Sequence, residues 1–254
     1  MRSFVVDDLT VHVHDQDRDL AADAADAAAE AIAAAIGARG VAHVMLATGN
    51  SQLEFLDALT AREDVDWSAV IGFHMDEYVG IPADHPASFR RYLRERVVDV
   101  VHPRAFEYVE GDAPDAEAEC RRYGALLAAH PLDVCCLGIG ENGHLAFNDP
   151  PVADFDDPVA VKVVELDAAC RRQQVGEGHF PDLDAVPRRA ITVTIPALLA
   201  AARVLAIVPE ARKAAPVTAA LTGPIGPACP ASALRRAPHT TLYLDADSAA
   251  GLAA

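Results

Sequence analysis

The sequence predicts an α/β fold built on a mostly parallel β-sheet with helices on both faces. Apolar stretches of strand length alternate with helical stretches along the whole chain. Three of these strands are followed by segments rich in small and polar residues, and ligands bind beyond the carboxyl ends of parallel strands. We therefore expect those three segments, 48–51, 75–78 and 138–150, to share one pocket. The 254 residues contain no visible linker, so a single domain over 1–254 is expected.

The hydrophobic pattern assigns the individual elements. In chain order, the first half is predicted to form a strand at 4–14, a helix at 21–35, a strand at 41–47, a helix at 52–59, a strand at 69–75, and helices at 87–97 and 115–129. The second half is predicted to form strands at 132–137, 159–166, 191–195, 204–208 and 240–244, with helices at 167–174, 196–202 and 213–221. Asp19, Asp23 and Asp26 lie towards the start of the first, Ala-rich helix, where the helix dipole favours acidic residues.

Composition argues against a nucleic-acid-binding, membrane-spanning or secreted protein. The formal net charge of −17 argues against a nucleic-acid partner, because phosphate backbones require a basic surface. No apolar run is long enough to span a bilayer, and the N-terminus does not read as a signal peptide. The five cysteines are odd in number and form no C-x-x-C motif, which is typical of free thiols in a reducing cytosol. A cytoplasmic protein is expected.

The segment from Gly138 to Pro150 follows an apolar strand and is the most informative part of the chain. It begins as G-x-G-x-x-G, and Glu165 lies about 20 residues on, as a dinucleotide fingerprint requires. That pattern would make the protein an NAD-dependent dehydrogenase. Prolines at 150 and 151 argue against the helix that should follow. The glycines are better explained as a turn that presents a His144–Asp149 pair, in which the carboxylate orients the imidazole for proton transfer.

Other residues are candidates for the same pocket. Thr48, Gly49, Asn50 and Ser51 form a strand-to-helix turn whose backbone N–H groups suit a phosphate, although an ordinary helix-capping turn has the same composition. Asn142 is placed to orient the substrate or His144. Asp76 and Glu77 follow another strand and are either a general base with its neighbour or solvated loop acids. Lys213 begins a late helix and either reaches a phosphate or is solvated.

Metal binding is a weaker interpretation. No second His or Cys lies at ligand spacing near His144. His12 and His14 form an H-x-H on the first strand, a spacing that suits a metal, but an exposed strand face is the better interpretation.

Several segments together resemble the glucosamine-6-phosphate deaminase/isomerase family, which shares its fold with 6-phosphogluconolactonases. They are Leu46–Ser51, Phe73–Pro82 followed by His85–Phe89, Gly138–Pro150, Val186–Pro187 before Ala190–Val193, and Lys213–Ala214. The strings Met-Asp-Glu-Tyr and Gly-His-x-Ala-Phe-Asn-Asp-Pro are the most specific. Their order and spacing cover most of the chain, from about residue 40 to 220.

The resemblance implies a Rossmann-like three-layer α/β/α sandwich and a reaction without metal or cofactor. An aminosugar phosphate would become fructose 6-phosphate and ammonia. Asp76 matches the family's base for the C2 proton, and His144 matches the residue that opens the pyranose ring. Asp149 would orient His144, and Asn142 would stand beside them.

The remaining site residues also follow from the resemblance. The phosphate clamp matches the 48–51 loop and Lys213, and Glu77 and Gly143 are expected among the substrate contacts. A lid is expected at approximately 150–190, with Arg171 or Arg172 closing over the phosphate.

Alternatives of other classes stay open at this point. They are a 6-phosphogluconolactonase-type hydrolase, a deaminase of galactosamine 6-phosphate, and a non-enzymatic sugar-phosphate sensor. A C2 base at Asp76 distinguishes a deaminase from a lactonase. Self-association into a homo-oligomer is also open.

Overall fold

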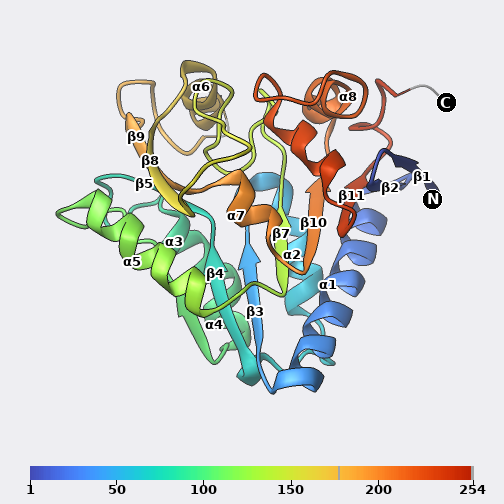
Figure 1. The fold of residues 1–254 in the computed structure, drawn as a ribbon, viewed down its shortest axis with the longest axis horizontal. Coiled ribbons are helices and arrows are strands. Elements are labelled where there is room, and N and C mark those ends of the chain that lie inside the picture. The colour runs from blue at the N-terminus through green and yellow to red at the C-terminus, as the bar shows by residue number, and fades with distance from the viewer. Residues whose placement is uncertain (177, 253–254) are drawn as a thin grey trace.

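The fold is the predicted three-layer α/β/α sandwich around a mostly parallel sheet, as a computed structural model of residues 1–176 and 178–252 shows (Figure 1). The eight strands of the main sheet lie in the order β1 (Arg2–Val6), β2 (Leu9–Val13), β11 (Thr240–Leu244), β10 (Arg203–Val208), β7 (Val134–Leu137), β3 (Ala42–Leu46), β4 (Val70–His74) and β6 (Ala105–Glu107). Every pairing is parallel except that of β1 with β2.

Each face of the sheet is covered by its own helices. On one face lie α1 (Asp17–Arg39), α2 (Leu53–Thr60) and α3 (Phe89–Leu93), the last of which continues through a π-helical turn (Arg94–Val98) into α4 (Asp99–Val101). The other face packs against α5 (Ala116–Ala129), α7 (Ile195–Leu199) and α8 (Ala214–Thr222). Ala24, Ala28 and Ile32 of α1 are fully buried, so small side chains let this helix lie close to the strands.

Two of the predicted strands do not join the main sheet. β8 (Val161–Glu165) and β9 (Arg189–Val193) form a separate antiparallel sheet with β5 (Asp76–Tyr78), a strand the sequence did not reveal. The chain leaves the main sheet after β4 and pairs with β9 instead. This small sheet packs Tyr78, Phe147 and Phe180 into a third hydrophobic cluster beside α6 (Ala168–Gly176).

The predicted strand at 4–14 is a hairpin. Asp7 has a φ of 51°, and the Asp7–Asp8 pair turns the chain between β1 and β2. Aspartate tolerates this left-handed conformation better than most residues, so the acidic pair marks the turn.

The strand order also explains where a ligand would bind. From β3 the chain moves outward to β4 and β6, and from β7 it moves outward the other way to β10 and β11. This reversal opens a crevice at the carboxyl ends of β3 and β7. In Figure 1, α6 and α8 lie above this edge of the sheet.

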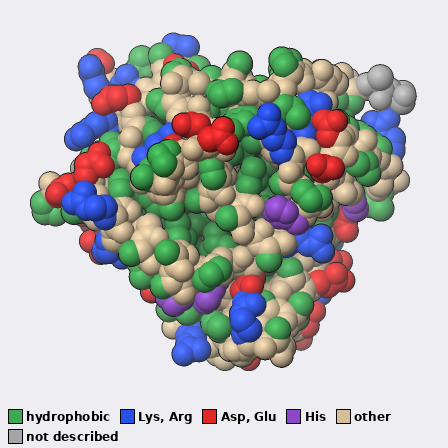
Figure 2. Space-filling model, in the orientation of Figure 1, with side chains coloured by type: hydrophobic (Ala, Val, Ile, Leu, Met, Phe, Trp, Pro, Cys, Tyr) green, Lys and Arg blue, Asp and Glu red, His purple; other side chains and the backbone are tan. Residues whose placement is uncertain are grey.

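On the face shown in Figure 2, basic and acidic side chains are interspersed. Within residues 1–176 and 178–252, no helix combines the length and apolar character needed to cross a membrane. All five cysteines are free thiols, as predicted.

Candidate active site

A partly open cavity lies at the carboxyl ends of β3, β4 and β7. The three segments singled out in the sequence all contribute to its wall, with the 48–51 loop, Asp76 and the 138–147 turn facing one another. The expectation of one shared pocket is confirmed.

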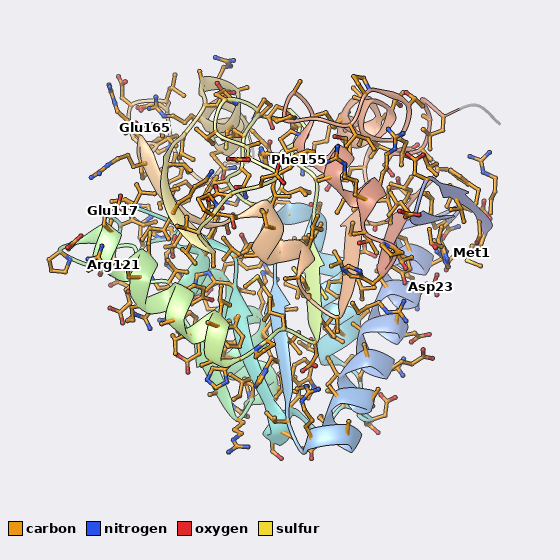
Figure 3. All side chains as sticks on the ribbon, in the orientation of Figure 1. Met1, Asp23, Glu117, Arg121, Phe155 and Glu165 are labelled. Carbon is orange, nitrogen blue, oxygen red and sulfur yellow. The ribbon has the colours of Figure 1, made fainter. Side chains whose placement is uncertain are left out.

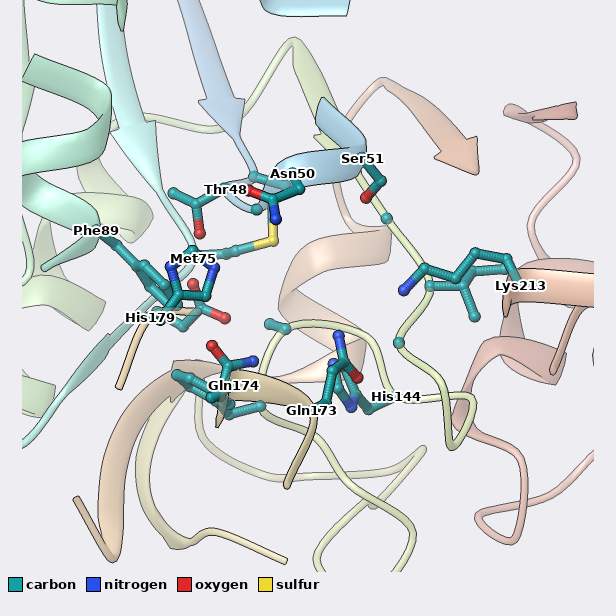
Figure 4. Close-up of a pocket in the computed structure, with 18 residues that line it drawn as sticks. Thr48, Asn50, Ser51, Met75, Phe89, His144, Gln173, Gln174, His179 and Lys213 are labelled. Atoms are coloured by element: carbon teal, nitrogen blue, oxygen red, sulfur yellow. The ribbon is translucent and has the colours of Figure 1, made fainter. Parts of the chain in front are cut away.

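One side of the cavity suits an anion. Thr48, Gly49, Asn50 and Ser51 all line it, and a 3₁₀ turn from Asn50 to Gln52 leads directly into α2. Gly49 has a φ of 103°, a conformation in which a Cβ is strained. Lys213 is only 3% exposed and lines the same cavity. Figure 4 shows its side chain extending toward the interior beside Ser51.

Asp76 and Glu77 have different surroundings because they are neighbours on a strand. Successive side chains of β5 point to opposite faces. Asp76 lines the cavity, whereas Glu77 is fully buried away from it. The Glu77 carboxylate accepts hydrogen bonds from Ser88 Oγ at 2.7 Å and from Arg90 N at 3.1 Å, at the start of α3. The expected contact of Glu77 with substrate is therefore not seen, because its carboxylate is used by α3.

The pKa of Asp76 is shifted strongly. Burial raises it well above its usual value, and the charge of Glu77 raises it further. Burial also raises the pKa of Glu77, against the hydrogen bonds from Ser88 and the α3 backbone. A carboxylate with a raised pKa is a stronger base once it is ionised, and such shifts cluster at functional sites.

His144 is oriented by two oxygens. Its Nδ1 lies 2.8 Å from Asn142 Oδ1 and 2.9 Å from Asp149 Oδ1. The Asn142 amide also donates to Asp149 Oδ1, at 2.9 Å. Since both oxygens accept, they favour a proton on Nδ1 and leave a lone pair on Nε2 for proton transfer.

The charge on Asp149 is stabilised in place. Burial acts to raise its pKa, but the hydrogen bond and charge of His144, together with the Asn142 amide, outweigh it and hold the pKa below its usual value. The thiol of Cys170, on α6, approaches the same pair, with ligand atoms of all three residues within 4.8 Å. Burial and then the Asp149 charge raise the pKa of Cys170 well above its usual value, so it packs there as a neutral thiol.

The glycines of the 138–143 turn allow close approach. A Cβ on Gly140 would lie 2.1 Å from His144 Nε2, so only glycine lets the imidazole pack there. Gly143 has a φ of 84° and does not line the cavity, so its expected substrate contact is not seen and its role is in the turn. The turn is tied to β9 by Asn148, whose amide donates to the Val193 carbonyl at 2.8 Å.

A dinucleotide-binding turn is excluded by the same segment. All of residues 138–160 are described, and none of them is helical. The fingerprint requires a helix directly after the glycines, so the dehydrogenase alternative is wrong.

The segment that follows covers the cavity with residues the sequence did not identify. Gln173 and Gln174 of α6 and the later His179 line it, as does Phe89 of α3 (Figure 4). Tyr78 holds Gln174 in place through a hydrogen bond of 2.6 Å from its hydroxyl to Oε1. Glutamines on a short polar helix look like ordinary solvated residues, so only the chain's path across the cavity reveals them.

Neither candidate arginine reaches the cavity. Arg171 donates to the backbone carbonyls of Leu183 and Val186 and so supports its own segment. Arg172 faces a separate surface hollow beside Glu141 and Arg212. The expected contact of either residue with phosphate is not seen, because α6 directs both away from the cavity.

Known proteins with the same architecture identify the family. The family described as glucosamine-6-phosphate isomerases/6-phosphogluconolactonase matches residues 15–243. A glucosamine-6-phosphate deaminase of Listeria innocua is 35% identical over 204 residues, which is 80% of this chain and 85% of that protein. One from Streptococcus equi subsp. zooepidemicus is 32% identical over 215 residues, covering 85% and 89%.

Solved structures agree with this assignment. A monomeric glucosamine-6-phosphate deaminase superimposes with a TM-score of 0.85 at 30% identity, over 95% of this chain and 99% of that one. A 6-phosphogluconolactonase from Shewanella baltica, at 21% identity and a TM-score of 0.77 over 95% of this chain and 97% of that one, shares the fold. The chain belongs to the glucosamine-6-phosphate isomerase/6-phosphogluconolactonase family.

Proposed function

We propose that this protein is a glucosamine-6-phosphate deaminase, which converts glucosamine 6-phosphate into fructose 6-phosphate and ammonia. One observation carries the proposal beyond family membership. A buried carboxylate of raised pKa, Asp76, faces the same cavity as an oriented imidazole, His144. A proton transfer next to a sugar carbonyl needs this combination of a base and a second acid–base group.

The phosphate would bind between the 48–51 loop and Lys213. The backbone N–H groups of the loop and the start of α2 favour an anion, and the lysine supplies a compensating charge. Holding the phosphate fixes the sugar's position before any bond is broken.

Ring opening would be carried out by His144. Its Nε2 takes the proton of the O1 hydroxyl and returns a proton to the ring oxygen O5, which releases the open-chain aldehyde. Asp149 and Asn142 keep the Nδ1 proton in place and stabilise the positive charge while the imidazole carries both protons.

Isomerisation would then use Asp76. The carboxylate removes the C2 proton, and the electron pair forms the C1–C2 enol as the former aldehyde oxygen takes up a proton from solvent. Return of the proton to C1 leaves a C2 iminium, to which water adds. Loss of ammonia gives the C2 ketone of fructose 6-phosphate.

A lactonase is the second candidate because the solved lactonases share the fold. Asp76 argues for the deaminase, since lactone hydrolysis requires no base at C2. The curated relatives cited above are deaminases at 32–35% identity, whereas the cited lactonase structure is 21% identical.

The organisation of the chain is proposed on the same basis. Residues 1–254 form one catalytic domain, and 150–190 form a lid, because Gln173, Gln174 and His179 from this segment line the cavity. A cytoplasmic location and the absence of a nucleic-acid partner remain predictions from the sequence. So does self-association, and sedimentation of the purified protein measures it.

The test is release of ammonia from glucosamine 6-phosphate, with galactosamine 6-phosphate and 6-phosphogluconolactone assayed in parallel. We expect turnover of the glucosamine substrate and a 10²–10⁴-fold loss of kcat in Asp76→Asn, the range for one acid–base group. Substrate affinity of that variant should be retained in a calorimetric titration. Turnover of the lactone alone, or normal turnover by Asp76→Asn, contradicts the proposal.

A further inference from the structure

A second group of ionisable side chains lies near the β1–β2 edge of the main sheet. The strands β10 and β11 separate it from β7 and β3, where the cavity lies. His12 lies in β2, two strands beyond β10 in the main sheet, and His14 directly follows the end of that strand. Residues two apart on a strand point to the same face, and here that face meets α1. Asp23 of α1 contacts both imidazoles and lies near the β1–β2 hairpin (Figure 3).

The three side chains converge on one oxygen. Asp23 Oδ2 lies 3.2 Å from His12 Nδ1 and 3.1 Å from His14 Nε2. A single ligand atom from each residue lies within 4.8 Å of the other two. Since a carboxylate only accepts hydrogen bonds, both imidazoles donate to the same atom when no metal is bound.

The burial of these residues corrects the expectation of an exposed strand face. His14 is only 6% exposed, and His12 and Asp23 retain 24% and 37% of their side-chain exposure. The Tyr243 ring covers His12 from the neighbouring strand, with the ring centroids 5.4 Å apart. The group is therefore partly enclosed, with an opening to solvent at Asp23 and His12.

The spacing fits a small metal ion. A tetrahedral zinc ion with bonds of about 2.0–2.1 Å holds its ligand atoms roughly 3.3–3.4 Å apart. The two nitrogen–oxygen distances, 3.1 and 3.2 Å, are close to that separation. One cation would replace the two shared protons among three ligand atoms that already lie within 4.8 Å of one another.

The donor set indicates which ion. Two imidazole nitrogens and one carboxylate oxygen suit borderline metals such as Zn²⁺ and Co²⁺, and disfavour Ca²⁺ and Mg²⁺, which prefer oxygen ligands. Three protein ligands leave a fourth position for water, and the partial exposure of Asp23 and His12 provides access.

We propose that His12, His14 and Asp23 form a binding site for a divalent transition-metal ion of the zinc class, separate from the sugar-phosphate cavity. The ion would join the end of the edge hairpin to α1, because two ligands come from residues 12–14 and the third from Asp23 of the helix. The site is independent of the proposed deaminase reaction, in which none of these residues takes part.

Metal binding is measured on full-length protein without an affinity tag, after chelator treatment and desalting. Titration with Co²⁺ should produce visible absorption bands that saturate at one equivalent and are abolished by added Zn²⁺. The melting temperature should rise with Zn²⁺ concentration, since a ligand that binds the folded state stabilises it.

Matched variants assign the binding to this site. His12→Gln and Asp23→Asn are conservative changes at partly exposed positions, and each should weaken Co²⁺ binding at least 10-fold and remove the Zn²⁺ effect on melting. His102→Gln, which removes an exposed imidazole elsewhere, and His144→Gln, in the cavity, should bind like the wild type. Unchanged binding in His12→Gln and Asp23→Asn, or loss in His144→Gln instead, overturns the proposal. So does a wild-type protein that binds no Co²⁺ at millimolar concentration.

Discussion

Asp149 and Asn142 hold one nitrogen of His144 from two directions, with Asp149 Oδ1 at 2.9 Å and Asn142 Oδ1 at 2.8 Å from Nδ1. The carboxylate supplies the charge and the amide supplies both a second acceptor and a donor to the carboxylate. Neither residue lines the cavity, so we expect both to act on substrate through the imidazole.

This arrangement predicts that the two residues can be exchanged. Asp149→Asn removes the charge that stabilises the protonated imidazole, and we expect kcat for ammonia release to fall about 100-fold, the lower end of the range for a group that supports acid–base catalysis. The double variant Asp149→Asn/Asn142→Asp restores one carboxylate and one amide at Nδ1. The kcat of the double variant should reach at least a tenth of the wild-type kcat. A double variant no faster than Asp149→Asn would contradict this account.

Asp76 should lower the stability of the folded protein at neutral and higher pH. Its pKa is raised on folding, so the unfolded chain releases this proton at a lower pH than the folded one. The penalty therefore grows as pH rises from the usual carboxyl range toward the folded-state pKa. Asp76→Asn should be more stable than the wild type at pH 8 and equal to it near pH 4. Urea unfolding at both pH values measures this, and equal stabilities at pH 8 would count against a raised pKa.

The charge of Glu77 should influence the pH at which the activity falls on the acid side of the pH–rate profile. The proposed proton abstraction requires an ionised Asp76, and the charge of Glu77 contributes to the raised pKa of Asp76. Glu77→Gln should therefore shift the acid limb of kcat/KM to lower pH, while weakening the start of α3 by about 1–3 kcal/mol.

Ser88→Ala is the matched control, because it removes a hydrogen bond from Ser88 Oγ to Glu77 but keeps the charge. In this variant, kcat/KM should fall on the acid side at the same pH as in the wild type. Identical shifts in both variants would mean that disruption of α3, rather than charge, moves the limb.

Lys213 should act on binding more than on chemistry. A hydrogen bond to a charged group is worth about 1.5–3 kcal/mol, so Lys213→Met should raise KM for the sugar phosphate roughly 10–100-fold with a smaller change in kcat. Inhibition by inorganic phosphate should weaken in parallel. Arg212→Met is the control, since Arg212 pairs with Glu210 and faces another hollow. An equal increase in KM in Lys213→Met and Arg212→Met would contradict a specific role of Lys213 in phosphate binding.

The architecture was largely predictable, because hydrophobic periodicity is a local property. The alternation of strands and helices predicted the layered sheet, and the positions of polar loops after strands predicted which segments meet at its edge. Short elements were missed: β5 and β6 have three residues each, too few to show a period.

The direction of each side chain was less predictable. Asp76 and Glu77 look equivalent in sequence, yet the alternation of β5 places one in the cavity and the other beneath α3. Arg171 and Arg172 were expected to reach the phosphate, but Arg171 donates to the backbone at Val186 and Arg172 faces another hollow.

The sequence by itself determined the fold class, the family resemblance and the three segments that form the pocket, because these depend on local pattern and on motif order. Only the tertiary structure decided that Gln173, Gln174 and His179 cover the cavity, and that Asp23 meets His12 and His14. Those contacts join residues on different elements. They depend on how each strand and helix is rotated and packed, which no local stretch of sequence encodes.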